Sequence, residues 1–282
     1  RPRSTRRRAR EMVHARSMAT HRAHVSIGIA GTLGTEAAAR IAAAVEAAGF
    51  YGLWVNEVAG TDSLAMLAAA AEATTNLTLA TGVIPVDRRS GSEIAARVVE
   101  LGLPTERVAV GIGSGKQGPG SLARVADAID QIREETDARV LVGALGPRMR
   151  QLAAERAHGA LLSWLTPPVA AAQAAEFHEI APEGHVALYA RTAVDAAGIP
   201  RRDAEALAYA GYPAYKANYA RLGMDPYGTL LPQPGDDSIA PGAEAYRASV
   251  DELVLRAMAS GDAVDDYVRF AETASEALGL RV

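Results

Sequence analysis

Short apolar runs alternate with longer amphipathic stretches along almost the whole chain. The apolar runs are rich in Val, Ile and Leu, which is typical of strands that are buried on both faces. They lie at residues 25–30, 53–55, 77–80, 107–112, 139–142, 160–162, 185–192 and 250–256. The stretches between them repeat apolar residues, mostly alanine, at helical spacing. They lie at residues 35–48, 61–74, 92–101, 121–135, 147–156, 167–178, 201–222 and 263–278.

Eight strands that alternate with helices predict a parallel sheet closed into a single (β/α)8 TIM barrel. An open, doubly wound parallel sheet is the alternative, because short strands are easily miscounted. Most connections are short, apart from residues 86–91 and 223–241. The segment after the seventh strand is expected to form a helical cover or a contact between subunits, and a break at Pro213 would divide its helix in two.

Composition narrows the class of protein. The hydrophobic fraction of 49% and the charged fraction of 22% are typical of a globular chain. The absence of cysteine excludes disulfides, thiolate catalysis and cysteine-based zinc sites. The six histidines form no metal-binding motif, and no apolar run approaches the roughly 18 residues of a membrane span. We therefore expect a cytoplasmic protein with no metal site and no membrane partner.

The first 24 residues differ from the rest, since they contain eight arginines and a single acid, Glu11. Such a basic segment could bind nucleic acid or another acidic surface. It has no aromatic side chain to stack on bases and no apolar core of a secretory signal. We therefore expect a flexible extension over residues 1–24 without a nucleic-acid partner, followed by the barrel domain over residues 25–282.

A tight glycine turn follows the fifth predicted strand and precedes a helix. It reads Gly143, Ala144, Leu145, Gly146, Pro147 and Arg148. Pro147 suits the first turn of a helix, where its missing N–H is not needed. Free backbone amides at that helix end would attract a phosphate, and Arg148 could add a charge-assisted hydrogen bond. On spacing alone, an ordinary strand-to-helix turn with a glycine at positive φ is the favoured interpretation.

In a barrel of this class, the functional groups lie at the carboxyl ends of the strands. Small polar residues and glycines follow most of the predicted strands: Asn56, Glu57, Thr81, Gly82, Val83, Gly113, Ser114, Gly115, Trp164, Thr166 and Arg191. General acids and bases are few among them, so the ring suits a flat cofactor held mainly by backbone contacts. Neither a Walker loop nor a dinucleotide fingerprint is present. Tyrosines at helical spacing between Tyr209 and Tyr219 are interpreted as packing or an oligomer surface.

Four segments, in this order and spacing, resemble the flavin- and deazaflavin-dependent oxidoreductases of the bacterial luciferase-like superfamily. They are AGFYGLWV at 48–55, LTLATGVIP at 77–85, VAVGIGSG at 108–115, and GALGPRM followed by HGALLSWLT at 143–166. The resemblance extends over about two-thirds of the chain. It implies a barrel that binds coenzyme F420 or FMN and transfers hydride to or from a small organic substrate. With FMN it also allows monooxygenation, and it implies a homodimer.

The resemblance also assigns roles to the strand ends. Residues 81–83 and 113–115 would lie against the cofactor ring, and the family often has a cis non-proline peptide at 81–83. The residues themselves predict only a plain strand end there. The turn at 143–148 and Thr166 would hold the phosphate end, and Trp164 would belong to the same cofactor site.

Four residues depart from the family pattern. The family commonly has Asp-His where this chain has Asn56 and Glu57, and an acid where it has Lys116; His158 replaces an aspartate. Glu57, with Asn56, is the candidate catalytic acid or base, and a surface glutamate in a loop is the equally supported alternative. These changes leave a non-catalytic flavin-binding or structural barrel as an alternative function. A phosphosugar-type barrel enzyme would need a lysine or paired acids in the barrel mouth.

Overall fold

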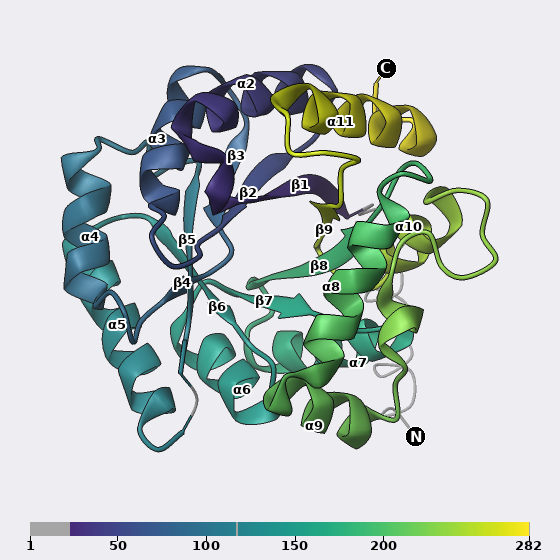
Figure 1. Cartoon of the computed structure of the whole chain (residues 1–282). Coiled ribbons are helices and arrows are strands. Elements are labelled where there is room, and N and C mark those ends of the chain that lie inside the picture. The colour runs from purple at the N-terminus through teal and green to yellow at the C-terminus, as the bar shows by residue number, and fades with distance from the viewer. Residues whose placement is uncertain (1–22, 117, 282) are drawn as a thin grey trace, which may run out of the picture.

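The computed structural model describes residues 23–116 and 118–281, so the predicted extension lies almost entirely outside the described residues. Its strands form the centre of the molecule and its helices an outer ring (Figure 1). The strand order is β3-β2-β1-β9-β8-β7-β6-β5-β4, and β3 also pairs with β5, so that the sheet closes on itself. All pairings between named strands are parallel. The predicted (β/α)8 TIM barrel is confirmed, and the open sheet is wrong.

The eight predicted strands are all present. They are β1 (His24–Ala30), β2 (Gly52–Asn56), β3 (Thr78–Thr81), β5 (Val108–Gly113), β6 (Arg139–Gly143), β7 (Gly159–Ser163), β8 (His185–Thr192) and β9 (Glu252–Ala257). The ninth label, β4 (Ile84–Pro85), is a short continuation of β3 after the cis peptide bond between Gly82 and Val83. The third barrel strand is thus interrupted at its carboxyl end.

The helices follow the predicted order. They are α2 (Gly34–Ala47), α3 (Ser63–Glu72), α4 (Gly91–Glu100), α5 (Ser121–Glu135), α6 (Pro147–Arg156), α7 (Pro167–Ile180), α8 (Ile199–Gly211), α9 (Pro213–Leu222), α10 (Ala240–Arg247) and α11 (Val264–Leu278), with single 3-10 turns η1 (Gly31–Leu33) and η2 (Pro226–Thr229). Pro213 divides α8 from α9 as predicted, because a proline fits the first turn of a helix but not its interior. Helix α10 was not predicted. The loop expected over residues 223–241 ends at Pro241, which instead lies in the first turn of this helix, where proline is common.

Side chains of the barrel strands point alternately outward to the helices and inward to the barrel axis. The outward side chains and the helices form the main hydrophobic core. The inward cluster is smaller and consists of Trp54, Ala80, Ala109, Leu141, Leu161, Ala187, Tyr189 and Val254, with Val83 packed against it. Its alanines leave space for the large rings of Trp54 and Tyr189. The top of this cluster, at the carboxyl ends of the strands, is the base of the site described below.

A third cluster joins the α8–α9 pair to the top of the barrel. It consists of Trp164, Ala206, Tyr219 and Leu230. Because this cluster is small, α8 and α9 are attached to the barrel by fewer buried side chains than the helices of the outer ring. Among the described residues, no helix is long and apolar enough to cross a membrane.

Candidate functional site

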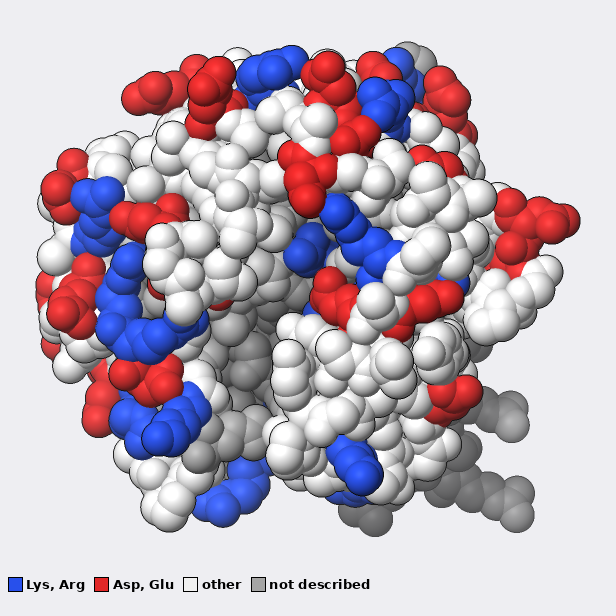
Figure 2. Space-filling model, viewed as in Figure 1, with Lys and Arg blue, Asp and Glu red and all other residues white. Residues whose placement is uncertain are grey.

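A cavity of about 740 Å³ opens at the carboxyl ends of strands β2 to β8. Figure 2 shows this face of the molecule hollowed near its centre, between the surface over α4 and α5 and the surface over α8 and α9. Twelve of the predicted site residues line the cavity: Asn56, Glu57, Gly82, Val83, Gly113, Ser114, Gly115, Gly143, Ala144, Leu145, Gly146 and Arg148. The sequence therefore identified one side of the site, at the ends of β2 to β6.

Val83 is the central feature of that side. It follows the cis peptide bond that the family resemblance implied, which the structure confirms. A Cβ atom at Gly113 would lie 2.6 Å from Val83 Cγ2, and one at Gly143 would lie 3.1 Å from Val83 Cγ1. A Cβ at Gly82 would overlap the hydroxyl of Tyr189. These glycines are therefore required so that Val83 can project into the barrel mouth above Tyr189.

Thr81 precedes the Gly82–Val83 peptide, here called the bulge, and lies outside the cavity. Its hydroxyl donates to the Gly111 carbonyl and accepts from the Gly111 N–H, both at 2.9 Å. The side chain is fully buried and holds β3 against β5. We therefore place Thr81 as a residue that positions the bulge, and not as a contact to a bound molecule.

The loop after β5 is fixed by an acid from the loop after β4. The Asp87 carboxylate accepts from the Lys116 N–H at 2.8 Å. Gly115 has φ +60°, and a Cβ there would overlap the same carboxylate. Because side chains other than glycine rarely adopt this conformation, Gly115 is needed for the loop to turn towards the cavity beside Ser114.

The glycine turn after β6 lies next to this loop, because β6 pairs with β5. The Ala144 N–H donates to the Leu161 carbonyl at 3.0 Å, so the turn is tied to β7. Gly146 precedes α6, and no side chain caps this helix. The amides of its first turn therefore remain available to an anion, as the sequence predicted. Arg148 adds a positive charge at the same place.

Trp164 and Thr166 do not line the cavity. Trp164 is 1% exposed and has φ +59°, which turns its ring under the guanidinium of Arg191 at 4.0 Å. Thr166 precedes α7, and its hydroxyl faces Met224 Sδ at 3.7 Å. Trp164 therefore supports the cavity wall from behind, and neither residue is brought to the site that the sequence predicted for it.

Glu57 lines the cavity, but one carboxylate oxygen is already engaged. Oε2 accepts from the Ser63 hydroxyl at 2.7 Å and from the Ser63 N–H at 3.3 Å, and Arg89 Nη1 lies 3.7 Å away. The side chain is 6% exposed, so the alternative of a surface glutamate is wrong. The carboxylate holds the start of α3 in place and presents only its other oxygen to further partners. Beside it, Asn56 Oδ1 is buried and has no hydrogen-bond partner among the described residues.

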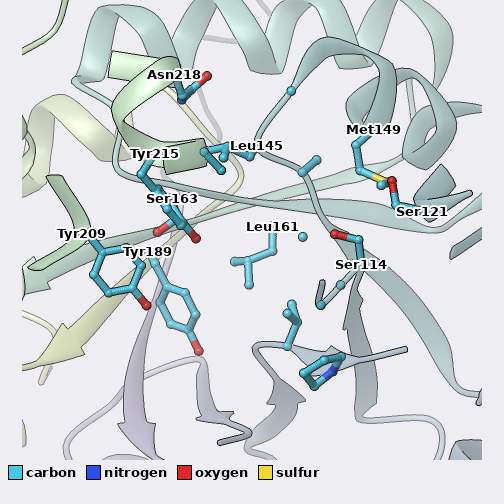
Figure 3. A pocket seen from close by; sticks show the side chains of 18 of the residues that line it. Ser114, Ser121, Leu145, Met149, Leu161, Ser163, Tyr189, Tyr209, Tyr215 and Asn218 are labelled. Carbon is cyan, nitrogen blue, oxygen red and sulfur yellow. The ribbon is translucent and has the colours of Figure 1, made fainter. Parts of the chain in front are cut away.

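The other side of the cavity comes from β7, β8 and the α8–α9 pair, and sequence analysis missed most of it. Its main side chains are Leu161, Ser163, Tyr189, Arg191, Tyr209, Tyr215, Asn218 and Arg221. Figure 3 shows Ser163, Tyr189, Tyr209 and Tyr215 on one side of the cavity and Ser114, Ser121 and Met149 on the other. Two-residue periodicity along β8 places Tyr189 and Arg191 on the same inward face, and this signal could have identified both.

The tyrosine row between Tyr209 and Tyr219 is divided between three environments. Tyr209 and Tyr215 line the cavity, Tyr212 is more than half exposed, and Tyr219 is buried behind the wall. The interpretation as packing or oligomer surface is therefore incomplete, because it missed the two tyrosines that face the site. A row at helical spacing shows a common face, but not what that face covers.

Two phenols of this wall, Tyr189 and Tyr215, are neutral donors over the usual pH range. Burial raises the pKa of Tyr189, although Arg256 and Arg191 act in the opposite direction. Burial also raises the pKa of Tyr215 to about 12. Tyr189 Oη is buried without a hydrogen-bond partner in the described chain. Such an atom normally has a partner, so it points to a bound molecule that accepts a hydrogen bond.

The charges that line the cavity are mostly positive. Arg148, Arg191 and Arg221 face it from α6, β8 and α9, whereas Glu57 is the one acid among the described lining residues. No group of His, Cys, Asp or Glu in the described part of the chain could hold a metal ion. The cavity therefore favours an organic molecule with anionic groups over a metal ion.

The model of a protein family described as luciferase-like monooxygenase matches residues 18–120. Among solved structures, an F420-dependent secondary alcohol dehydrogenase in complex with an F420-acetone adduct shares 14% identity. The match covers 92% of this chain and 99% of that one, with a TM-score of 0.69. The F420-dependent tetrahydromethanopterin reductase of Methanopyrus kandleri shares 17% identity over 91% of this chain and 99% of its own, with a TM-score of 0.64.

An FMN complex has a similar fold. It is the oxygenating constituent of 3,6-diketocamphane monooxygenase from Pseudomonas putida, with 14% identity, coverage of 90% of this chain and 97% of that one, and a TM-score of 0.62. A search of curated protein sequences finds no match. The family match agrees with the luciferase-like resemblance over residues 18–120, and the structural likenesses confirm the fold.

Proposed function

We propose, from the match of residues 18–120 to the luciferase-like monooxygenase family and the fold shared with F420- and FMN-dependent enzymes, that this chain binds F420 or FMN and transfers hydride to or from a small organic substrate. The observation that carries the proposal is the position of Val83. It forms an apolar ledge in a mouth lined mainly by glycine backbone, with Tyr189 beneath it. A flat ring can lie against such a ledge with backbone atoms around it, and the cavity volume is typical of cofactor sites.

Three groups would hold the anionic end of the cofactor. They are the uncapped first turn of α6, the guanidinium of Arg148, and Arg221 with its neighbour Asn218. Asn218 accepts from Arg221 through Oδ1 at 2.5 Å, while its Nδ2 is buried without a partner among the described residues. Orphaned donors of this kind are satisfied by a ligand, and F420 and FMN both carry a phosphate. The residues therefore fit either cofactor.

When bound, the reduced cofactor supplies a hydride, or with FMN can react with dioxygen. The protein then has to bind, orient and exclude water. Ser114 and Asn56 would bind polar groups at the ring edge, and the neutral hydroxyl of Tyr189 would donate a hydrogen bond from below. Glu57 Oε1 is the carboxylate oxygen that remains to accept or deliver a proton, because Oε2 is held by Ser63.

Calorimetric titration of the full chain with F420 and, separately, with FMN tests the proposal. We expect tight binding of one of them, and at least about tenfold weaker binding by Arg148→Ala, because a charge-assisted hydrogen bond is lost. Arg156→Ala is the matched control, since Arg156 lies at the far end of α6 in an ion pair with Asp130. Its affinity should equal that of the wild type.

The outcome also separates the alternatives. Binding of F420 alone supports hydride transfer, whereas preference for FMN supports a reductase or a monooxygenase. Binding of neither at high micromolar concentration would overturn the proposal and favour a barrel without the cofactor. A phosphosugar-type enzyme is disfavoured, because no lysine lines the cavity among the described residues. The homodimer stays a prediction.

A further inference from the structure

Arg191 is a buried cation on the cavity wall that the cofactor assignment leaves unused. It is 3% exposed, yet it lines the cavity from the carboxyl end of β8. A charged side chain this deeply buried normally needs partners for all its polar atoms. The partners of its polar atoms therefore indicate which kind of ligand the guanidinium can bind.

The guanidinium is held in one orientation by two hydrogen bonds and two rings. Nε donates to Glu205 at 2.9 Å, and Nη1 donates to Ser163 Oγ at 2.5 Å. Its carbon lies 4.0 Å from the centre of the Trp164 ring and 4.9 Å from that of Tyr209. Within the described chain, Nη2 has no acceptor. The free edge of a rigid fork is thus presented to the cavity.

We propose that this edge binds a carboxylate of the substrate, beside the hydroxyls of Tyr209 and Tyr215, and that the enzyme acts on organic acids. This inference rests on the proposed function, because only an enzyme that binds the cofactor would have a substrate at this position. A single carboxylate fits better than a phosphate dianion, since Glu205 already offsets part of the charge of Arg191. Arg256, opposite Arg191 on β9, donates to the Ala257 carbonyl and does not line the cavity. A phenol hydroxyl beside the guanidinium can donate a hydrogen bond to the same carboxylate.

The position of Arg191 favours the substrate over the tail of the cofactor. Arg191 follows Tyr189 on the same inward face of β8, and Tyr189 lies against Gly82 and the Val83 ledge. The anionic end of the cofactor has its own groups on α6 and α9, which are Arg148 and Arg221. A molecule bound at Arg191 would therefore have its uncharged part over Leu161 and the ledge, where the ring is expected.

Benzoate and benzamide form a probe pair that differs in charge but hardly in shape. Trp164 stacks on Arg191 and is one of only two tryptophans in the chain, so intrinsic fluorescence reports binding without cofactor. In the full chain we expect benzoate to bind at least about tenfold more tightly than benzamide, as for a charge-assisted hydrogen bond. Equal affinities for the two probes would overturn the proposal.

Variants locate the effect. Arg191→Met should abolish the preference for benzoate, and Tyr215→Phe should weaken benzoate binding severalfold. Tyr212→Phe is the matched control, because Tyr212 precedes α9 but is exposed outside the cavity, and should leave both affinities unchanged. A preference for benzoate that survives in a folded Arg191→Met protein would contradict the proposal. If that variant does not fold, the comparison of benzoate with benzamide on the wild type still tests the proposal.

A second titration distinguishes the two sources of the carboxylate. With F420 or FMN bound at saturation, the preference for benzoate should persist if the substrate uses Arg191. Loss of the preference would show that an anionic group of the cofactor occupies this edge, and would overturn the assignment to the substrate. If the proposed function is wrong, neither F420 nor FMN will bind. The benzoate and benzamide titration without cofactor does not depend on that result, so the two failures can be distinguished.

Discussion

Two buried phenols share an unusual property at the residue scale. Tyr189 Oη and Tyr219 Oη have no hydrogen-bond partner within the described residues. Leaving a buried hydroxyl unpaired costs free energy of folding. Tyr189 lines the cavity, where a bound molecule can satisfy it, whereas Tyr219 packs behind the wall with Trp164 and Leu230. The unpaired hydroxyl therefore has a functional explanation in Tyr189 but not in Tyr219.

Replacing each phenol by phenylalanine separates these roles. Both Tyr189→Phe and Tyr219→Phe should raise the free energy of unfolding by about 1 kcal/mol, because an unpaired buried hydroxyl is removed. Tyr189→Phe should also weaken binding of the cofactor or substrate about fivefold, as for one lost neutral hydrogen bond. Urea unfolding and calorimetry on the same preparations check both effects. Unchanged binding by Tyr189→Phe, or weaker binding by Tyr219→Phe, would contradict the assignment.

At the scale of elements, α9 covers the cavity but is weakly anchored. Only Asn218 and Tyr219 are buried on this helix, whereas five side chains of α2 are buried. Segments with few buried apolar contacts open locally at low free energy. Helix α9 also contributes Tyr215, Asn218 and Arg221 to the cavity. Local opening of this helix would therefore admit and release ligands.

Hydrogen exchange followed by mass spectrometry tests this role. In the free protein, the amides of α9 should exchange faster than those of α2, by the argument from burial. Addition of a binding cofactor should slow exchange in α9, since the ligand joins it to the barrel, and leave α2 unchanged. Equal exchange in both helices, or no protection of α9 in the complex, would show that α9 is a fixed wall.

The sequence predicted the strands and helices better than it predicted which side chains contact one another in the folded protein. Each strand is a compact apolar run, so all eight were found, and Pro213 marked the division between α8 and α9. The glycines at 82, 113 and 143 were assigned to the cofactor, but their physical reason is the space that Val83 and Tyr189 need. Trp164 was misplaced because its positive φ turns the ring away from the cavity. The sequence placed Arg191 at a strand end, but it did not show that the tyrosines of α8 and α9 lie beside it, because such contacts between distant segments are not contained in a single sequence.

For the whole molecule, one carboxylate joins the strands at which the barrel closes. Glu252 is fully buried at the start of β9, at the end of the strand away from the cavity. It accepts from Ser26 at 2.5 Å and from Trp54 at 2.6 Å, and lies 2.7 Å from His185 Nε2. These partners belong to β1, β2 and β8. The first and last strands are thus connected by this group as well as by their own ladder, in which His24 lies opposite Glu252.

The titration of Glu252 should make the barrel sensitive to acid. Burial alone would raise its pKa, but His185, Ser26 and Trp54 outweigh burial and hold the pKa below the ordinary value of 4.5. A lowered pKa means that the folded state prefers the charged form. Its contribution to stability is therefore complete above about pH 4.5 and is lost as the pH falls through the lower folded value. The pairing of His178 with Asp251 raises the pKa of His178, so its own contribution is lost at higher pH.

Glu252→Gln should lower the free energy of unfolding at pH 7 by about 2 kcal/mol, since the hydrogen bonds from Ser26 and Trp54 to a charged carboxylate become bonds to a neutral amide. The difference from the wild type should shrink below about pH 4.5, because the wild type then loses what the variant already lacks. Urea unfolding at pH 7 and at pH 4 measures both quantities. Glu272→Gln, an exposed carboxylate on α11, should leave stability at both pH values close to that of the wild type. A Glu252→Gln protein that loses stability in acid as steeply as the wild type would show that another carboxylate controls acid unfolding, and would leave Glu252 with a packing role in barrel closure.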